Sequence, residues 1–264
     1  MKRKVTASLK LVSARLKLSS AGLSLVGIAA VVLLLFLFFN RLPAASTEPT
    51  TYTATVYPTD DSHTYWYKFN HKYANTNYGK YSVTYIEDYS TYSLKYSFIK
   101  FDISSLPEDA VITKAEFRFR PYSMYNMRYV ETIDVHNVDD NSWSESTITW
   151  NNQPGVSGLV AQIDPDADYP ILSPSLTYPL DITERVKQDF NTDKMVNLRM
   201  SLNKKGTYYS AYIKVYTKEY SFIQYRPYLY IEYQLPEPEI PEPPSTQLPL
   251  TDVLNRIWST ITGG

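Results

Sequence analysis

The chain has 264 residues, no cysteine and three histidines, which excludes disulfides and thiolate metal sites and argues against a zinc site. It carries 25 tyrosines and only 8 glycines, and this aromatic richness favours β-structure over helices or disorder. Seven of the 26 basic groups lie in residues 1–41, which hold no acid, so 19 basic and 27 acidic residues remain outside that segment. The negative remainder argues against a nucleic-acid partner.

Residues 21–39 are nineteen uncharged, mostly apolar residues, enough for one helix to cross a bilayer. The basic segment before them, 1–20, favours retention in the cytoplasm, so we expect a signal anchor. The protein would then be a single-pass cell-membrane protein with the lipid bilayer as one partner and its domain on the extracellular side. Two rival interpretations are a cleaved signal peptide, for which "RLPAAS" is a poor cleavage site, and a pilin-type signal cut near Gly22.

A short linker, 40–51, leads to a domain expected over 52–235. Apolar and polar residues alternate in it with a period of two. In "VITKAEFRFR" one face is formed by Val111, Ala115, Phe117 and Phe119. Similar runs cover 99–103, 196–202, 211–217 and 228–233. Many short alternating runs separated by turns predict an all-β sandwich or barrel.

One segment of the domain departs from this period. In "LDITERVKQDF", residues Leu180, Ile182, Val186 and Phe190 recur at spacings that predict a short helix lying over a sheet edge.

The chain ends in a spacer and a tail. The spacer, 236–250, begins with "PEPEIPEPP", and its prolines and glutamates favour an extended polyproline conformation. The tail, 251–264, predicts a short amphipathic helix that is too short to span a bilayer. We interpret it either as a frayed end or as a helix that docks on a partner, a membrane surface or the domain, through Leu254, Ile257, Trp258 and Ile261.

Five blocks occur in a fixed order: "KYANTNYG" (72–79), "FIKFDISSLPEDAVITKAEFRF" (98–119), "WSESTITWNNQP" (143–154), "LDITERV" (180–186) and "YTKEY…YRPYLYIEY" (216–233). Together they resemble the DNRLRE domain, which is related to the disaggregatase-associated repeats of methanogenic archaea and to the family 96 carbohydrate-binding modules. The resemblance implies a jelly-roll β-sandwich on an exported protein, with a polysaccharide as partner. Together with the anchor expected at 21–39, it suggests a membrane-anchored, archaeal surface protein.

Two groups of aromatic residues are candidates for sugar binding, because pyranose rings stack on exposed aromatic faces. The first lies in the inserted "HTYWYKFNH" (63–71) and comprises Tyr65, Trp66, Tyr67 and Phe69. The second lies in "PYSMYNMRY" and includes Tyr122 and Tyr125. The alternative is that these residues are half-buried members of a sheet.

Trp143 and Trp150 belong to the third block of the resemblance. The alternation of Ser146–Trp150 predicts a strand that directs Ile148 and Trp150 into the sandwich. We therefore expect both tryptophans to be structural core, with their indole N–H groups bonded to backbone carbonyls.

A structural calcium ion is the one cofactor that the sequence suggests, since jelly-roll modules often hold one at strand ends. The candidate ligands are Asp60, Asp61, Asp139 and Asp140. The alternative is that these aspartates cap turns.

No serine-centred elbow, glycine-rich phosphate loop or HExxH motif occurs, so we expect no enzymatic activity and no catalytic residues. The expected function is binding of polysaccharide or another surface component, in adhesion or envelope organisation. The alternative is a structural subunit of an envelope complex or extracellular filament, assembled through the C-terminal tail.

Overall fold

The computed structural model describes residues 49–89, 91–165, 173–206, 209–236, 255–256 and 258–260. The membrane helix expected over 21–39 therefore lies outside the described residues, as do most of the linker and the spacer. Within the described part of the chain, no helix is both long enough and apolar enough to cross a membrane. Residues 255–256 and 258–260 are helical, and Trp258 is 67% exposed there. Leu254, Ile257 and Ile261 fall outside the described residues.

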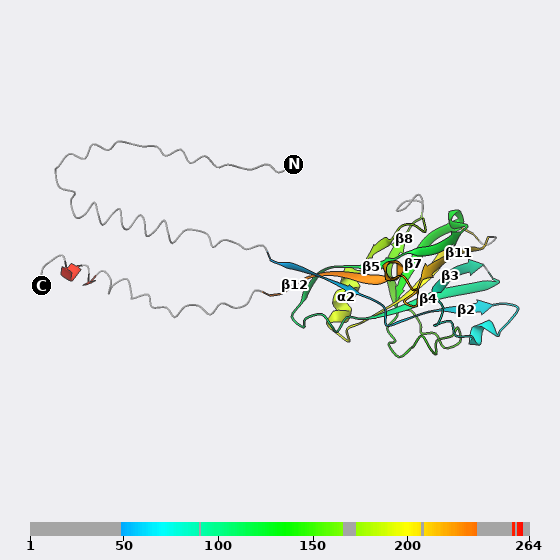
Figure 1. Ribbon diagram of the computed structural model, residues 1–264, viewed down its shortest axis with the longest axis horizontal. Helices are drawn as coiled ribbons and strands as arrows, with labels where there is room; N and C mark the ends of the chain where they lie inside the picture. The colour runs from blue at the N-terminus through cyan, green and yellow to red at the C-terminus, as the bar shows by residue number, and fades with distance from the viewer. Residues whose placement is uncertain are drawn as a thin grey trace, which may run out of the picture. The chain divides into compact units, whose positions relative to one another are not determined.

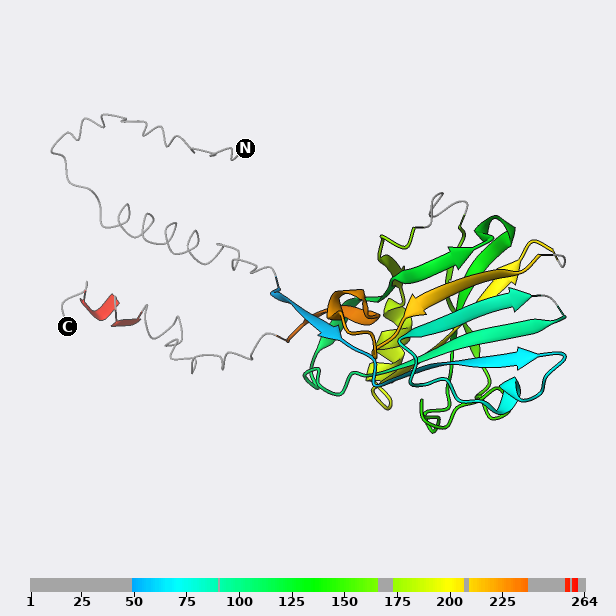
Figure 2. The ribbon, with the colours of Figure 1, turned by 45° about the vertical axis from the view of Figure 1, so that its right-hand side comes forward.

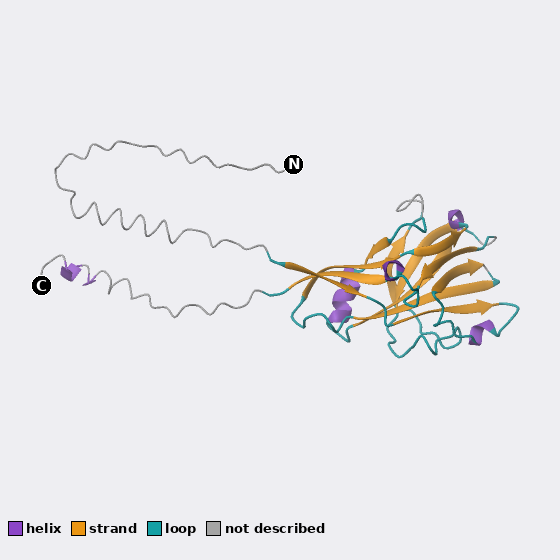
Figure 3. Ribbon diagram, in the orientation of Figure 1, coloured by secondary structure: helices purple, strands orange, loops and turns teal. Residues whose placement is uncertain are grey.

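Strands dominate the described domain (Figure 3). They are β1 (Thr51–Val56), β2 (Asp60–Tyr67), β3 (Val83–Tyr89), β4 (Ser93–Asp102), β5 (Val111–Phe119), β6 (Pro121–Tyr125), β7 (Val130–Asn137), β8 (Gly158–Ile163), β9 (Tyr178–Asp181), β10 (Met195–Lys204), β11 (Ala211–Tyr216) and β12 (Tyr228–Gln234). The helices are α2 (Thr183–Phe190) and the 3-10 turns η1 (Tyr73–Asn75), η2 (Met127–Tyr129) and η3 (Ile223–Tyr225).

The strands form two antiparallel sheets (Figure 1). The smaller has the order β1-β12-β5-β9, and the larger has the order β6-β11-β3-β4-β10-β7-β8, with β2 paired to β4. Buried residues of both sheets make one apolar cluster, which includes Phe101, Phe117 and Leu198. The expectation of an all-β sandwich is therefore confirmed, while the jelly-roll connectivity stays a prediction.

The strands expected from alternation over 99–103, 111–119, 196–202, 211–217 and 228–233 correspond to β4, β5, β10, β11 and β12. One detail of β5 was wrong: Val111 is 57% exposed, and Ile112 is buried in its place. The pairing with β12 shifts register between Glu232 and Tyr233, which face Lys114 and Ile112 respectively. This bulge adds one residue to β5 and reverses its alternation.

The helix expected from the 180–190 segment is confirmed as α2. Its buried side chains include Val186 and Phe190, which join the main core. Thr183 at its start accepts a hydrogen bond from the backbone N–H of Ala115 in β5, at 2.8 Å. The helix therefore lies against the smaller sheet, as the spacing indicated.

The strand expected over Ser146–Trp150 is absent, and this segment is a turn within the long loop 138–157. The turn closes through hydrogen bonds from the N–H groups of Thr147 and Ile148 to the carbonyl of Ser144, at 3.1 and 2.9 Å. The short alternation there comes from a loop whose apolar residues each make their own packing contacts. Over so few residues, a period of two does not distinguish such a loop from a strand.

Loop 138–157 covers a second, smaller core. Trp143 and Ile148 pack with Phe98 and Val138. Phe98 alternates along β4 with Ile99, which belongs to the main core, so the two clusters lie on opposite faces of the larger sheet.

The two tryptophans of this loop differ in burial. Trp143 is buried, but its indole nitrogen has no hydrogen-bond partner among the described residues, contrary to the expectation. Instead, the ammonium of Lys100 lies 4.5 Å from the Trp143 ring centroid and donates to the Trp143 carbonyl. Trp150 is half-buried and stacks on Tyr96 at 5.1 Å, so it covers the sheet from outside.

Candidate functional site

Tyrosines and charged residues form a row across five neighbouring strands of the larger sheet. Tyr125 of β6 lies opposite Tyr212 of β11, and Tyr212 lies opposite Glu87 of β3. Glu87 lies opposite Lys95 of β4, and Lys95 lies opposite Tyr65 of β2. Directly opposite residues share a face of the sheet, so all five lie on one face. Figure 2 shows β11 (gold), β3 and β4 (blue-green) and β2 (cyan) as successive strands.

A second row runs beside the first. Lys214 of β11 lies opposite Tyr85 of β3. Its ammonium is 4.7 Å from the Tyr85 ring centroid and 5.5 Å from that of Tyr212. We call the seven residues of the two rows the tyrosine face: Tyr65, Tyr85, Glu87, Lys95, Tyr125, Tyr212 and Lys214. Five strands at a spacing of about 4.8 Å make it roughly 19 Å wide, a width suited to an extended ligand.

The charges on the tyrosine face are fixed by contacts within it. The ammonium of Lys95 is 4.4 Å from the Tyr65 ring centroid and 4.8 Å from that of Tyr85. It also pairs with a carboxylate oxygen of Glu87 at 2.5 Å, and the other oxygen of Glu87 accepts from Ser93. The face is therefore preorganised, since its polar groups hold their positions without a ligand.

A cavity of about 260 Å³ opens at the β2 end of the tyrosine face. It lies where β3 leaves β4, because the two strands pair only over 87–89 and 93–95, and β4 pairs with β10 from Ser97 onward. Its lining consists of His63, Tyr65, Tyr73, Tyr78, Tyr81, Val83, Tyr85 and Lys95. Aromatic walls with a few polar groups are the usual composition of a small-ligand site.

His63 is the buried polar group of this cavity. Its ring stacks on Tyr78 at 4.3 Å, and its Nδ1 has no hydrogen-bond partner among the described residues. Burial, with a smaller effect of the Lys95 charge, lowers the pKa of His63 to about 3, so the imidazole is neutral at physiological pH. Burial also raises the pKa of Tyr65 to about 12, which keeps its phenol protonated. The phenol of Tyr65 can exchange hydrogen bonds with ligand hydroxyls.

Alternation along β2 divides the first aromatic group that the sequence singled out. Tyr65 and Tyr67 contact each other at 6.2 Å on the cavity side, and Phe69 continues from Tyr67 at 5.6 Å. Trp66 lies on the opposite face, 6.4 Å from Trp150. Trp66 therefore belongs with the loop 138–157 that covers the sheet.

The second aromatic group lies at the other end of the same face. Tyr125 stacks on Tyr212 at 5.5 Å, and Tyr122 makes an edge contact with Tyr216 at 5.4 Å. The structure thus brings residues 60 positions apart onto one surface. The sequence interpretation missed Tyr85, Lys95, Tyr212 and Lys214, although alternation in "VTYIEDY" and "AYIKVY" places the tyrosines of each strand on one face.

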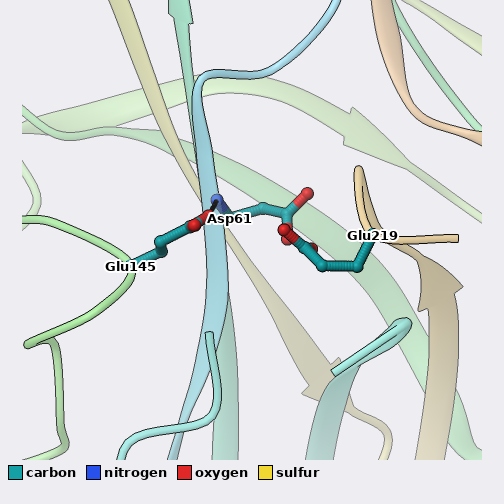
Figure 4. Close-up of side chains that lie close together, drawn as sticks. All are labelled: Asp61, Glu145 and Glu219. Carbon is teal, nitrogen blue, oxygen red and sulfur yellow. Dashed lines mark hydrogen bonds between the residues drawn. The ribbon is translucent and has the colours of Figure 1, made fainter. Parts of the chain in front are cut away.

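The four candidate calcium ligands separate into two places. Asp60 accepts from the N–H of Glu145 at 3.1 Å, and Asp61 lies in a group with Glu145 and Glu219. Asp139 pairs with Arg185 at 3.6 Å. Asp140 accepts from the N–H of Ser142 at 2.8 Å and thus caps a turn. Within the described part of the chain, Asp61, Glu145 and Glu219 are the one group of acids close enough to share an ion (Figure 4).

Two of the five sequence blocks, 72–79 and 143–154, meet beside this group. The side-chain N–H groups of Asn77 donate to the carbonyls of Glu145 and Ile148, at 2.6 and 2.8 Å. A Cβ at Gly79 would lie 2.0 Å from the Glu145 carbonyl oxygen, so glycine alone fits there. The backbone of Asn151 also donates to Ala74. Blocks 72–79 and 143–154 therefore hold each other in place, which is a structural role.

A larger hollow, about 700 Å³, lies over α2 and β5. Among the described residues, its lining includes no aromatic ring, and its two lysines are already paired: Lys114 with Glu116, and Lys187 with Glu184. It offers no stacking surface, so we place the candidate site on the tyrosine face.

Two comparisons with known proteins bear on this site. Residues 52–233 match carbohydrate-binding module family 96. A gellan lyase from Bacillus sp. is 33% identical over 103 residues, which make up 38% of this chain and 4% of that protein. The chain thus spans a small part of this relative.

Proposed function

The chain belongs to carbohydrate-binding module family 96, and on this premise we propose that the tyrosine face binds a polysaccharide without cleaving it. The observation that carries the proposal is the cross-strand row from Tyr125 to Tyr65, which ends at the His63 cavity.

In the proposed mode of binding, the tyrosine rings stack on the sugars and the charged groups form hydrogen bonds with them. Tyr125, Tyr212 and Tyr65 present rings on which the C–H faces of sugars stack. Lys214 and the Glu87–Lys95 pair offer charge-assisted hydrogen bonds to sugar hydroxyls or carboxylates. The cavity receives one sugar unit or a chain end at most, while the open rows hold the units that follow.

Binding rather than hydrolysis fits the distribution of acids. Glycosidases use two carboxyl groups that flank the scissile bond. Among the described residues, the cavity lining includes no carboxylate, and Glu87 of the face is held by Lys95 and Ser93. We therefore propose a non-enzymatic role in adhesion or envelope organisation at the cell surface, with the expected helix 21–39 as the anchor.

The test is calorimetric titration of the full chain with a panel of neutral and acidic polysaccharides, gellan among them because the Bacillus relative is a gellan lyase. Tyr125→Ala removes a tyrosine that is 50% exposed and stacked on its cross-strand neighbour at 5.5 Å. Tyr52→Ala is the matched control: Tyr52 is 42% exposed and stacks on Tyr233 at 5.6 Å, but in the smaller sheet.

Loss of one stacking ring, worth about 1 kcal/mol, should weaken binding roughly fivefold in Tyr125→Ala and leave Tyr52→Ala unchanged. Tyr65→Ala should show a loss at least as large. Equal affinities in all three variants, or no binding to any polysaccharide of the panel, would overturn the assignment of the face. Release of reducing ends would overturn the non-enzymatic role.

A further inference from the structure

Three acids from distant parts of the sequence meet at the start of β2 (Figure 4). Asp61 is the second residue of β2, Glu145 lies in loop 138–157, and Glu219 follows β11. One carboxylate oxygen from each lies within 4.8 Å of the others. Oxygens that bind one calcium ion at about 2.3–2.6 Å are separated by at most about 5 Å, so the three oxygens are close enough to share an ion.

Two oxygens of this group lack a hydrogen bond. Asp61 is 2% exposed, and its Oδ1 has no partner among the described residues, whereas its Oδ2 accepts from the N–H of Lys218 at 2.7 Å. Oε2 of Glu219 is likewise buried and without a partner. Figure 4 shows the carboxylates of Asp61 and Glu219 facing each other. A buried carboxylate oxygen without a partner is costly, so this arrangement calls for a further positive group.

The net charge of the three acids and Lys218 also favours a further positive group. Lys218 brings one positive charge to the cluster, since its ammonium pairs with Glu145 at 2.9 Å and with Glu219 at 2.6 Å. One lysine against three carboxylates leaves two negative charges, which one divalent cation would neutralise. The neighbouring Asp60 already has Lys100 at 3.9 Å.

We propose that Asp61, Glu145 and Glu219 form a binding site for a divalent cation, and that this cation is Ca²⁺. All the ligands are hard oxygens from three separate segments, and calcium accepts such irregular sets more readily than magnesium does. The ion would join β2, loop 138–157 and the segment after β11 at one point. Asp139 and Asp140 take no part in it.

The competing account is a proton shared between Asp61 and Glu219. Burial raises the pKa of Asp61 well above its ordinary value, and the carboxylate of Glu219 adds to the effect. A shared proton would relieve the same repulsion without a metal, so the experiment must separate the two.

The experiment uses the full chain after treatment with a chelator, titrated with Ca²⁺ and separately with Mg²⁺ by calorimetry. We expect one Ca²⁺ per chain with a Kd at or below about 1 mM, weaker Mg²⁺ binding, and a higher melting temperature in Ca²⁺. Glu219→Gln should weaken Ca²⁺ binding at least tenfold. Asp140→Asn, which alters an exposed carboxylate that caps a turn, should leave it unchanged.

Absence of both binding and a Ca²⁺-dependent melting shift at millimolar Ca²⁺ would overturn the proposal in favour of the shared proton. Binding with undiminished affinity in both Glu219→Gln and Asp61→Asn would overturn it by placing the ion elsewhere. Should Asp61→Asn fail to fold, Glu219→Gln and the wild-type titration still decide, because the Glu219 side chain is partly exposed. None of the three acids lines the His63 cavity, so a failure to bind polysaccharide would leave the outcome of the Ca²⁺ titration unaffected.

Discussion

Replacing Asn77 by alanine removes the side chain that fixes loop 138–157 to the 72–79 segment. Two donated hydrogen bonds are lost, to the carbonyls of Glu145 and Ile148, together with the bond that the Asn77 oxygen accepts from Gly79 at 3.2 Å. Each contributes about 1 kcal/mol net, so we expect Asn77→Ala to lower the free energy of unfolding by about 3 kcal/mol. For a domain of this size that corresponds to a fall in melting temperature of roughly 6–12 °C.

The assay is urea unfolding followed by far-ultraviolet circular dichroism. Asn70→Ala is the matched control, because Asn70 is exposed and only accepts from the N–H of Lys72; its loss should cost less than about 0.5 kcal/mol. Asn77→Asp keeps the oxygen and removes the donors, so it should be nearly as destabilising as Asn77→Ala. Equal stabilities of Asn77→Ala and Asn70→Ala would refute the conclusion that this asparagine holds the loop.

Two further changes test other parts of the fold. Trp150→Ala should reduce stability by about 2 kcal/mol through loss of stacking on Tyr96, with polysaccharide affinity unchanged in calorimetry; a loss of affinity would mean that this tryptophan contacts the ligand. Arg185→Leu leaves Asp189 buried without its ion pair and should cost about 3–5 kcal/mol near pH 8. Burial already raises the pKa of Asp189 to about 6, and loss of Arg185 raises it further. The folded state then binds this proton more tightly than the unfolded state, so the deficit of Arg185→Leu should shrink as the pH falls to about 5 and grow as the pH rises through the folded pKa. Urea unfolding at both pH values checks this, and a deficit that does not depend on pH would contradict it.

The strands could be predicted from the sequence because their alternation is set by burial on one side of a sheet. β11 follows it without interruption, and α2 follows the helical period. The bulge that exposes Val111 could not be predicted, since it depends on the pairing of Lys114 and Ile112 with β12. The turn at 144–150 was missed for a similar reason: its apolar residues pack on Phe98, which lies far away in the sequence.

The candidate site could be predicted only in pieces. Residues 63–71 and 121–129 stood out by their density of aromatic rings, but whether Tyr65 and Tyr125 share a face depends on strand order. Lys95 and Glu87 were not noticed, because a charged residue in an alternating strand is the ordinary solvent-facing residue. One of the three residues of the acidic group was anticipated: Asp61 was proposed as a calcium ligand, whereas Glu145 and Glu219 approach it only in the folded chain.

The tyrosine face contains no tryptophan, and this has a practical spectroscopic consequence. Trp66, Trp143 and Trp150 lie on the side of loop 138–157, and Trp258 lies in the tail. Indole emission therefore reports on that loop and on the tail, and a sugar bound as proposed would contact none of the three indoles of the domain. Absorbance or emission of the phenol rings is the intrinsic optical signal to follow, and a screen that monitors tryptophan fluorescence alone would record a binding-competent protein as inactive.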